Sequence, residues 1–165
     1  MSALLPGAAA PDFVLPAVDG KTFALKEALG RGPVVLAFFK VSCPTCQYAF
    51  PFLERIFKAH GGANVSIVGV SQNNARDTAA FLKAYGVSFP VLLDDARDYA
   101  VSNAYGLTNV PTIYWIAQDG EIAVSSVGWV RSDIDEINRR AAESAGQNVV
   151  PVFQSKEHVV EFRAG

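Results

Sequence analysis

The pattern of hydrophobic and polar residues is clearest between residues 34 and 57. An unbroken apolar run, rich in β-branched and aromatic side chains, extends from Val34 to Phe39 and follows Gly32-Pro33. Such a run is typical of a strand buried on both faces of a sheet. The next segment carries apolar residues at steps of three and four, which predicts a helix with one face toward a core. The residues of that face are Ala49, Phe52, Leu53, Ile56 and Phe57.

The rest of the chain alternates between strand and helix patterns. Asp19-Gly20 predicts a hairpin turn within residues 11–24, and residues 65–70 predict a second buried strand. Asn73-Asn74 predicts the cap of a helix that ends at Gly86. This order of elements predicts an α/β protein.

The second half continues with a short helix over residues 95–105 and a strand over 113–117. Asp119-Gly120 then predicts a turn into an antiparallel strand over residues 121–127. Ser132 and Asp135 resemble a capping box, so a helix is expected to start there and to run to about Ser144.

Length and composition limit the possible classes of protein. A chain of 165 residues is expected to form a single domain (1–165), with a flexible N-terminus (1–10) and a C-terminal tail (147–165) that adds an edge strand or covers the domain. The net charge of −2 argues against nucleic acid or an anionic membrane as partner. No apolar run is long enough to predict a membrane span.

The compartment is predicted from the start of the chain and from the cysteine count. The first residues lack a basic region and are interrupted by Pro6, so they do not read as a signal peptide. Both cysteines of the chain lie in one motif, which is compatible with a reducing cytosol. We therefore expect a cytoplasmic protein; the alternative is an exported or periplasmic protein whose signal has been removed.

Cys43-Pro44-Thr45-Cys46 lies between the predicted strand and the predicted helix. Pro44 suits the first helical turn, because it lacks the N–H that would be unpaired there and has a fixed φ. Cys43 would then face free N–H groups and the positive end of the helix dipole, surroundings that stabilise a thiolate. Cys46 lies one turn further on, close enough to form a disulfide. This arrangement predicts that Cys43 attacks and Cys46 resolves.

Two structural roles for the cysteine pair are less favoured. A structural zinc site needs four ligands, and the two histidines, His60 and His158, lie in unrelated contexts. A disulfide across two intervening residues closes too small a loop to stabilise much. The pair therefore favours redox chemistry.

The segment resembles the active site of the thioredoxin-like superfamily, in particular the TlpA/ResA-type thiol-disulfide oxidoreductases and the related AhpC/TSA redoxins. Pro51 matches the proline within the active-site helix, and the resemblance extends from about Ala10 to Ala142. It implies a thioredoxin-like fold, with a central mixed β-sheet flanked by helices and an N-terminal β-hairpin extension.

The resemblance also implies the site and its partners. Val110-Pro111 matches the loop whose cis-proline lies against the cysteine pair, and Pro44, Thr45, Val110 and Pro111 would contact substrate. The partners would be protein dithiols or disulfides and an upstream thiol reductant or oxidant. We expect a monomer that needs no cofactor. The cellular direction of exchange and the redox potential do not follow from the sequence.

The chain departs from the thioredoxin pattern at two positions near the motif. Ala37 occupies the place of a buried acid that helps to move the proton of the resolving thiol. Another group or water must take that role. Ser42 replaces the usual tryptophan, and Lys40 is a candidate modulator of the Cys43 thiolate, although a solvated lysine at a strand end is the more common outcome.

Two alternative functions are left open. Val41-Ser42-Cys43-Pro44-Thr45 resembles the peroxidatic segment of peroxiredoxins, which would make the protein a thiol peroxidase using Cys43. Against this, Lys40 and Pro111 stand where that family has a Thr or Ser and an arginine. The second alternative is a soft-metal module that binds copper through two thiolates. Met1 is the only methionine, and no histidine is close in sequence, which argues against it.

Overall fold

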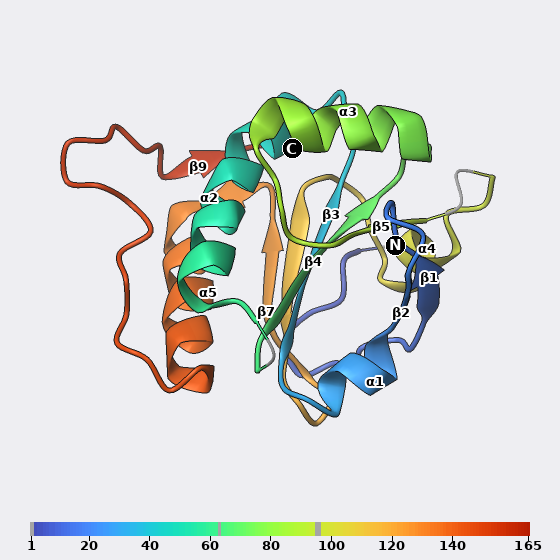
Figure 1. Ribbon diagram of the computed structural model, residues 1–165, viewed down its shortest axis with the longest axis horizontal. Helices are drawn as coiled ribbons and strands as arrows, with labels where there is room; N and C mark the ends of the chain where they lie inside the picture. The colour runs from blue at the N-terminus through green and yellow to red at the C-terminus, as the bar shows by residue number, and fades with distance from the viewer. Residues whose placement is uncertain (1, 63, 95–96) are drawn as a thin grey trace.

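A computed structural model describes residues 2–62, 64–94 and 97–165 (Figure 1). Its centre is a mixed five-stranded sheet in the order β5-β4-β3-β6-β7. β3 is parallel to β4 and antiparallel to β6. The strands are β3 (Val34–Phe39), β4 (Ser66–Ser71), β5 (Val91–Leu93), β6 (Thr112–Ile116) and β7 (Ile122–Val127).

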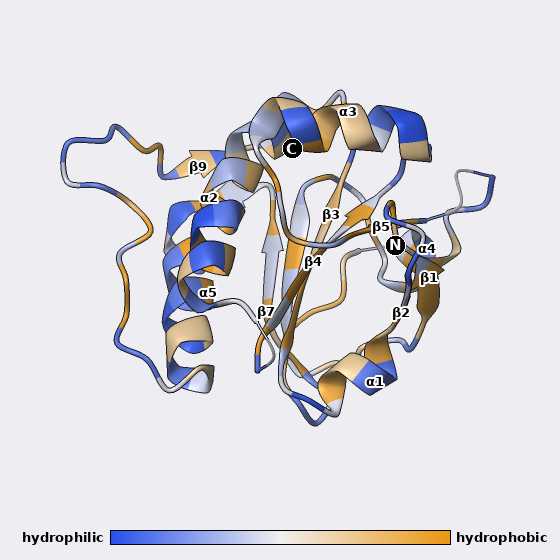
Figure 2. Cartoon of the chain, viewed as in Figure 1, coloured by the Kyte–Doolittle hydropathy of each residue, from blue (hydrophilic) through white to orange (hydrophobic). Residues whose placement is uncertain are grey.

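β3 is the central strand, and all its residues are buried. Its side chains alternate between two hydrophobic clusters: Val35, Ala37 and Phe39 enter one, and Val34, Leu36 and Phe38 enter the other. This explains the unbroken apolar run, because a strand covered on both faces has no solvent-facing position. Figure 2 shows the central strands as mainly hydrophobic.

Helices cover both faces of the sheet (Figure 1). One face packs against α2 (Pro44–His60), α3 (Ala75–Tyr85) and α5 (Arg131–Ser144). The other is covered by the hairpin of β1 (Val14–Pro16) and β2 (Thr22–Ala24), together with α1 (Leu25–Leu29) and α4 (Ala100–Ala104). The mixed sheet, the flanking helices and the N-terminal hairpin are confirmed.

Local signals predicted several boundaries correctly. The Asn74 side chain accepts a hydrogen bond from the Asp77 N–H at 2.8 Å and caps α3. Gly86 ends that helix in the left-handed region at φ 65°. There glycine avoids the steric cost that a Cβ would add.

The predicted capping box of Ser132 and Asp135 is wrong. α5 begins at Arg131, and its N-cap, Val130, makes no side-chain capping bond. The reason is tertiary: Trp129–Val130 forms β8, which pairs with β9 (Phe162–Arg163) immediately before the helix. The helix predicted over residues 95–105 is shorter, with α4 covering Ala100–Ala104, and positions 95 and 96 lie outside the described residues.

Both ends of the chain pack on the domain. The Gly7 N–H donates to Ile122 O and the Ala10 N–H to Gly120 O, each at 2.9 Å, so this segment lies along β7. The C-terminal tail, residues 147–165, runs across α2 and α5 and contributes β9 (Figure 1). It therefore covers the domain and forms a small sheet with β8, separate from the central one. Across the described residues, no helix is long and apolar enough to cross a membrane.

Candidate active site

Cys43 is the N-cap of α2, and Pro44 is the first helical residue. The Cys46 N–H donates a hydrogen bond to the Cys43 sulfur at 3.2 Å. This is a normal helix cap in which a sulfur replaces the usual oxygen acceptor. The predicted placement of the pair at the start of the helix is therefore confirmed.

The loop at Val110-Pro111 lies against Cys43. The Val110–Pro111 peptide bond is cis, as the resemblance implied. The Cys43 thiol donates to the Val110 carbonyl oxygen, with 3.4 Å between sulfur and oxygen. Cys43 is half-buried, and its backbone N–H donates to the Lys40 carbonyl at 3.2 Å. The sulfur thus lies between the first turn of α2 and the proline loop.

Cys46 lies in different surroundings. Its side chain is fully buried within the hydrophobic cluster that includes Ala49 and Phe50. Burial raises the pKa of the Cys46 thiol well above its ordinary value, and a hydrogen bond with the Cys43 side chain raises it further. Cys46 is therefore protonated in the reduced protein, and it must lose this proton before it can attack a mixed disulfide.

The position that holds a buried acid in thioredoxins is apolar here. Ala37 is fully buried in the middle of β3. Glu54, on α2, is a buried carboxylate that we did not identify from the sequence. It accepts bonds from the Ser88 N–H at 2.8 Å and the Ser88 hydroxyl at 2.5 Å. It follows Cys46 by two turns of helix, or about 12 Å, so it does not replace the missing acid.

Asp94 is a second buried carboxylate that we did not identify from the sequence. It accepts bonds from the Ser102 N–H and hydroxyl, both at 2.7 Å, and holds the start of α4. The Ser102 hydroxyl oxygen in turn accepts a bond from the Gln72 amide at 2.9 Å. This network shapes one wall of a cavity beside the site.

Lys40 lines that cavity, which has a volume of about 240 Å³. Its other lining residues are mainly polar: Gln72, Tyr99, Ser102, Asn103, Leu107, Thr108, Asn109 and Val110. Lys40 is exposed, and its contact with Cys43 is the hydrogen bond from the Cys43 backbone N–H to the Lys40 carbonyl. The influence of its ammonium group on the Cys43 thiolate stays a prediction.

The residues between the cysteines differ in exposure. Pro44 is exposed, whereas Thr45 is buried, and its hydroxyl donates to the Ala164 carbonyl at 2.6 Å. Gly165 lies on the proline loop, since a Cβ built on it would be 2.0 Å from the Val110 carbonyl oxygen. The C-terminal tail thus reaches the site. The sequence of the tail contains no signal that would have predicted this contact.

A metal centre has little support in the part of the chain that the structure describes. No group of three or more His, Cys, Asp or Glu side chains is arranged there to hold an ion. His60, one of the two histidines, is buried beside the tail. Its Nδ1 is 2.8 Å from the Gln147 side-chain oxygen, and its Nε2 accepts from the Val150 N–H at 3.2 Å.

Comparisons with known proteins agree with this geometry. Residues 6–125 match the AhpC/TSA family. Thiol-disulfide oxidoreductase ResA of Halalkalibacterium halodurans is 32% identical over 131 residues, covering 79% of this chain and 73% of that protein. ResA of Bacillus subtilis is 35% identical over 117 residues, covering 70% and 64%. A solved structure of a secreted Mycobacterium tuberculosis disulfide oxidoreductase has a TM-score of 0.67 and 26% identity, covering 79% of this chain and 95% of that one.

Proposed function

The chain belongs to the AhpC/TSA family and to its ResA-type thiol-disulfide oxidoreductases, and we propose that Cys43 and Cys46 carry out its disulfide exchange with protein substrates. Its fold is thioredoxin-like, as the resemblance implied. The observation that carries the proposal is the placement of the two sulfurs. Cys43 is half-buried at the helix start, and Cys46 is fully buried one turn further along the helix.

The exchange takes place in two displacements. The Cys43 thiolate attacks a substrate disulfide, forms a mixed disulfide and releases the first substrate sulfur as a thiolate. Cys46 loses its proton and attacks the Cys43 sulfur, which releases the second substrate thiolate and leaves a Cys43–Cys46 disulfide. Two electrons pass from the enzyme pair to the substrate, and the released thiolates take up protons. The reverse sequence oxidises a substrate dithiol.

The structure assists the first displacement at the Cys43 sulfur. The Cys46 N–H already points at this atom, and a hydrogen bond to a sulfur strengthens when the acceptor carries a charge. The unpaired N–H groups at the start of α2 add to the same field. Pro44 keeps one face of the motif open to a partner, since its side chain is exposed.

The proposal is tested by equilibrating the protein with glutathione buffers and following a protein disulfide as substrate. A redox-active pair gives a two-electron transition, and a potential near −270 mV indicates a reductant while one near −120 mV indicates an oxidant. A variant with both cysteines changed to serine is the control. A parent protein that neither forms the disulfide nor transfers it would refute the proposal.

Thiol peroxidase activity is the second candidate. It is favoured by the AhpC/TSA match and by the likeness of Val41-Ser42-Cys43-Pro44-Thr45 to a peroxidatic segment. Lys40 and Pro111 occupy the positions where the sequence comparison placed peroxide-binding groups. We therefore expect slow sulfenic acid formation at Cys43, at the rate of an ordinary reactive thiol. Stopped-flow mixing with hydrogen peroxide measures it, and a rate typical of dedicated peroxidases would reverse the order of the two functions.

We also propose a cytoplasmic monomer. The cytoplasmic location is supported by the absence of cysteines outside the motif, since cytosolic proteins seldom carry structural disulfides. The similar Mycobacterium tuberculosis protein is described as secreted, so export is the competing location. Cell fractionation distinguishes the two compartments, and light scattering measures the oligomeric state.

A further inference from the structure

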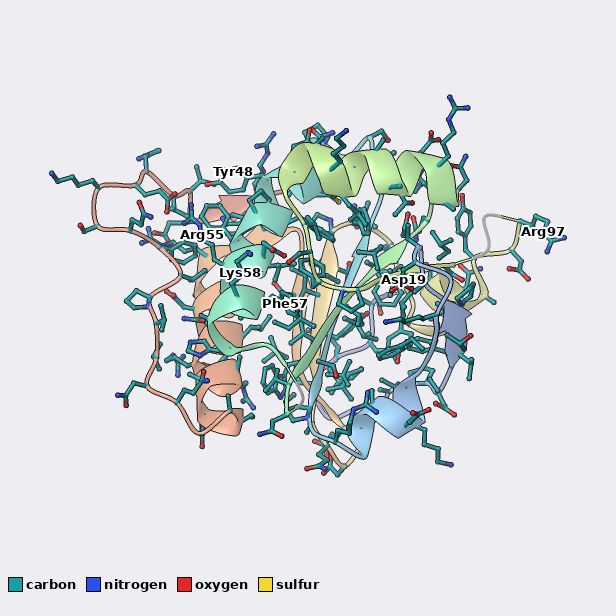
Figure 3. The ribbon with its side chains drawn as sticks, viewed as in Figure 1. Asp19, Tyr48, Arg55, Phe57, Lys58 and Arg97 are labelled. Carbon is teal, nitrogen blue, oxygen red and sulfur yellow. The ribbon has the colours of Figure 1, made fainter. Side chains whose placement is uncertain are left out.

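The C-terminal tail has a firmly held base, residues 147–160, on α2 and β8. Arg55 forms a bidentate pair with Glu157, both bonds at 2.7 Å, and also donates to Val152 O at 3.0 Å. The Trp129 indole N–H donates to Val160 O at 2.7 Å. Figure 3 shows Tyr48 and Arg55 extending from α2 on the side of the tail. Buried Val152 and Val159 complete these anchors.

The tip of the tail, residues 161–165, is held differently. All its residues are exposed, and Phe162 is 63% exposed. It pairs with β8 in the register Trp129↔Arg163 and Val130↔Phe162. The Ala164 carbonyl accepts the Thr45 hydroxyl at 2.6 Å. A segment with few buried contacts opens at low free energy, so the tip can leave while the base stays in place.

The tip lies directly on the backbone beside the nucleophile. Gly165 contacts the same Val110 carbonyl that accepts the Cys43 thiol, and any side chain at position 165 would collide with it. Gly128 allows the tip to lie close to the chain after β7, because a Cβ on residue 128 would be only 2.8 Å from the Arg163 carbonyl oxygen. The tip therefore shows that an extended segment fits this surface. It pairs with the backbone of β8 and places small residues over the proline loop.

We propose that residues 161–165 occupy the docking surface for an extended segment of the substrate protein, and that a substrate binds by replacing them alongside Trp129–Val130. This inference rests on the proposed disulfide exchange. Strand addition uses backbone hydrogen bonds, so it accepts many sequences. The position facing Val110 takes a glycine, because a Cβ there would collide with the Val110 carbonyl oxygen. The expected partners are unfolded or flexible disulfide-bearing segments.

The two sides of Cys43 then serve substrates of different size. On one side the tip covers the Val110 loop, and on the other the polar cavity lined by Lys40 is open. A small disulfide needs no backbone pairing with β8, so it can approach the half-buried Cys43 without moving the tip. A protein segment that pairs with β8 has to displace the tip first. The tip therefore slows protein substrates and leaves small ones unaffected.

Two variants remove the tip's hold without touching a cysteine: deletion of residues 162–165, and Gly165→Val, which collides with Val110. Lys156→Ala is the matched control, since it lies exposed in the base. Unfolding curves check that each variant is folded. Some samples of reduced protein are labelled at Cys43 with iodoacetamide or with a bulky maleimide. Separate, unlabelled samples are assayed with a small aromatic disulfide and with an unfolded protein disulfide.

We expect both tip variants to increase the rates of bulky labelling and of protein-disulfide reduction about fivefold. This factor corresponds to the net free energy that one hydrogen bond contributes to holding the tip in place. Rates with iodoacetamide and the small disulfide should not change. A synthetic peptide of residues 159–165 should inhibit the deletion variant with the protein substrate only. Unchanged bulky labelling, or equal acceleration with both substrates, would overturn this inference. A parent protein without any disulfide exchange would instead overturn the proposed function.

Discussion

The surroundings of Cys43 and Cys46 differ although the residues stand one helical turn apart. Cys43 is half-buried, and its sulfur lies between the Cys46 N–H and the Val110 carbonyl. Cys46 is fully buried in an apolar cluster. The N-cap residue lies outside the helix and the residue three positions later lies inside its first turn, so one motif produces an accessible and a protected thiol. We expect this difference in depth, and not a difference in residue type, to separate the roles of the two thiols.

The strongest test of this difference exchanges each cysteine for serine. Cys43→Ser removes the nucleophile and should lower disulfide exchange by about 10³-fold or more, the scale on which loss of a covalent nucleophile acts. Cys46→Ser keeps the attack but blocks resolution, so mixed disulfides with substrate should accumulate. Non-reducing gels measure both. If Cys43→Ser accumulated the adducts, the roles would be reversed.

Alkylation sharpens the same comparison in the reduced parent protein. Cys43 should react at neutral pH, while Cys46 reacts at least about 10² times more slowly, because a buried thiol must wait for local opening. Mass spectrometry after brief exposure to iodoacetamide, followed by digestion, identifies the labelled site. Denatured protein, in which both sites are open, is the control. Preferential labelling of Cys46 would contradict the assignment.

The pH dependence of the resolving step depends on the proton of Cys46. Burial raises the pKa of this thiol, so its thiolate is a minor species at neutral pH. Release of the mixed disulfide should therefore accelerate by about tenfold per pH unit through the neutral range and above, in proportion to the attacking thiolate. Single-turnover release between pH 6 and pH 9 (about the range in which a free thiol begins to ionise) measures it. A release rate that stops rising near pH 7 would reveal another group that accepts the Cys46 proton, in place of the acid that is missing at Ala37.

The smallest expected effect is on stability at high pH. The pKa of Cys46 is higher in the folded protein than in the unfolded chain, where it is 9.0. The protonated thiol therefore contributes fully to the stability of the fold below pH 9.0, and this contribution is lost as the pH rises above that value. Above this pH, the free energy of unfolding of the reduced parent should fall by up to about 1.4 kcal/mol per pH unit more than that of Cys46→Ala. Urea unfolding at several pH values measures this difference.

Two buried tyrosines add a background to that measurement. Burial raises the pKa of Tyr105, and it raises the pKa of Tyr114 to about 12. Both therefore lower stability at still higher pH, with the same sign as Cys46. They are present in the parent and in Cys46→Ala alike, so their effect cancels in the comparison. Equal pH slopes for the two proteins would mean that Cys46 ionises as readily in the folded state as in the unfolded one.

Local signals in the sequence determined most of the architecture and the position of Cys43 at the start of α2. The apolar run predicted β3, Asp19-Gly20 predicted the β1–β2 hairpin, and Asn74 predicted the start of α3. Pro44 after Cys43 predicted the start of α2. Each of these features depends on residues close together in the chain, through burial, turn geometry or capping. They can therefore be predicted without knowing the tertiary contacts.

Contacts between distant residues decided the rest. Pairing of Trp129 with Arg163 begins α5 one residue before the predicted cap at Ser132. The same pairing brings Ala164 to Thr45 and Gly165 to Val110, from a tail whose pattern predicted no such role. Strand pairing is made by backbone groups that every residue carries, so its partner cannot be identified from side chains alone. The contacts of the tail with Thr45 and Val110 therefore became visible only in the tertiary structure.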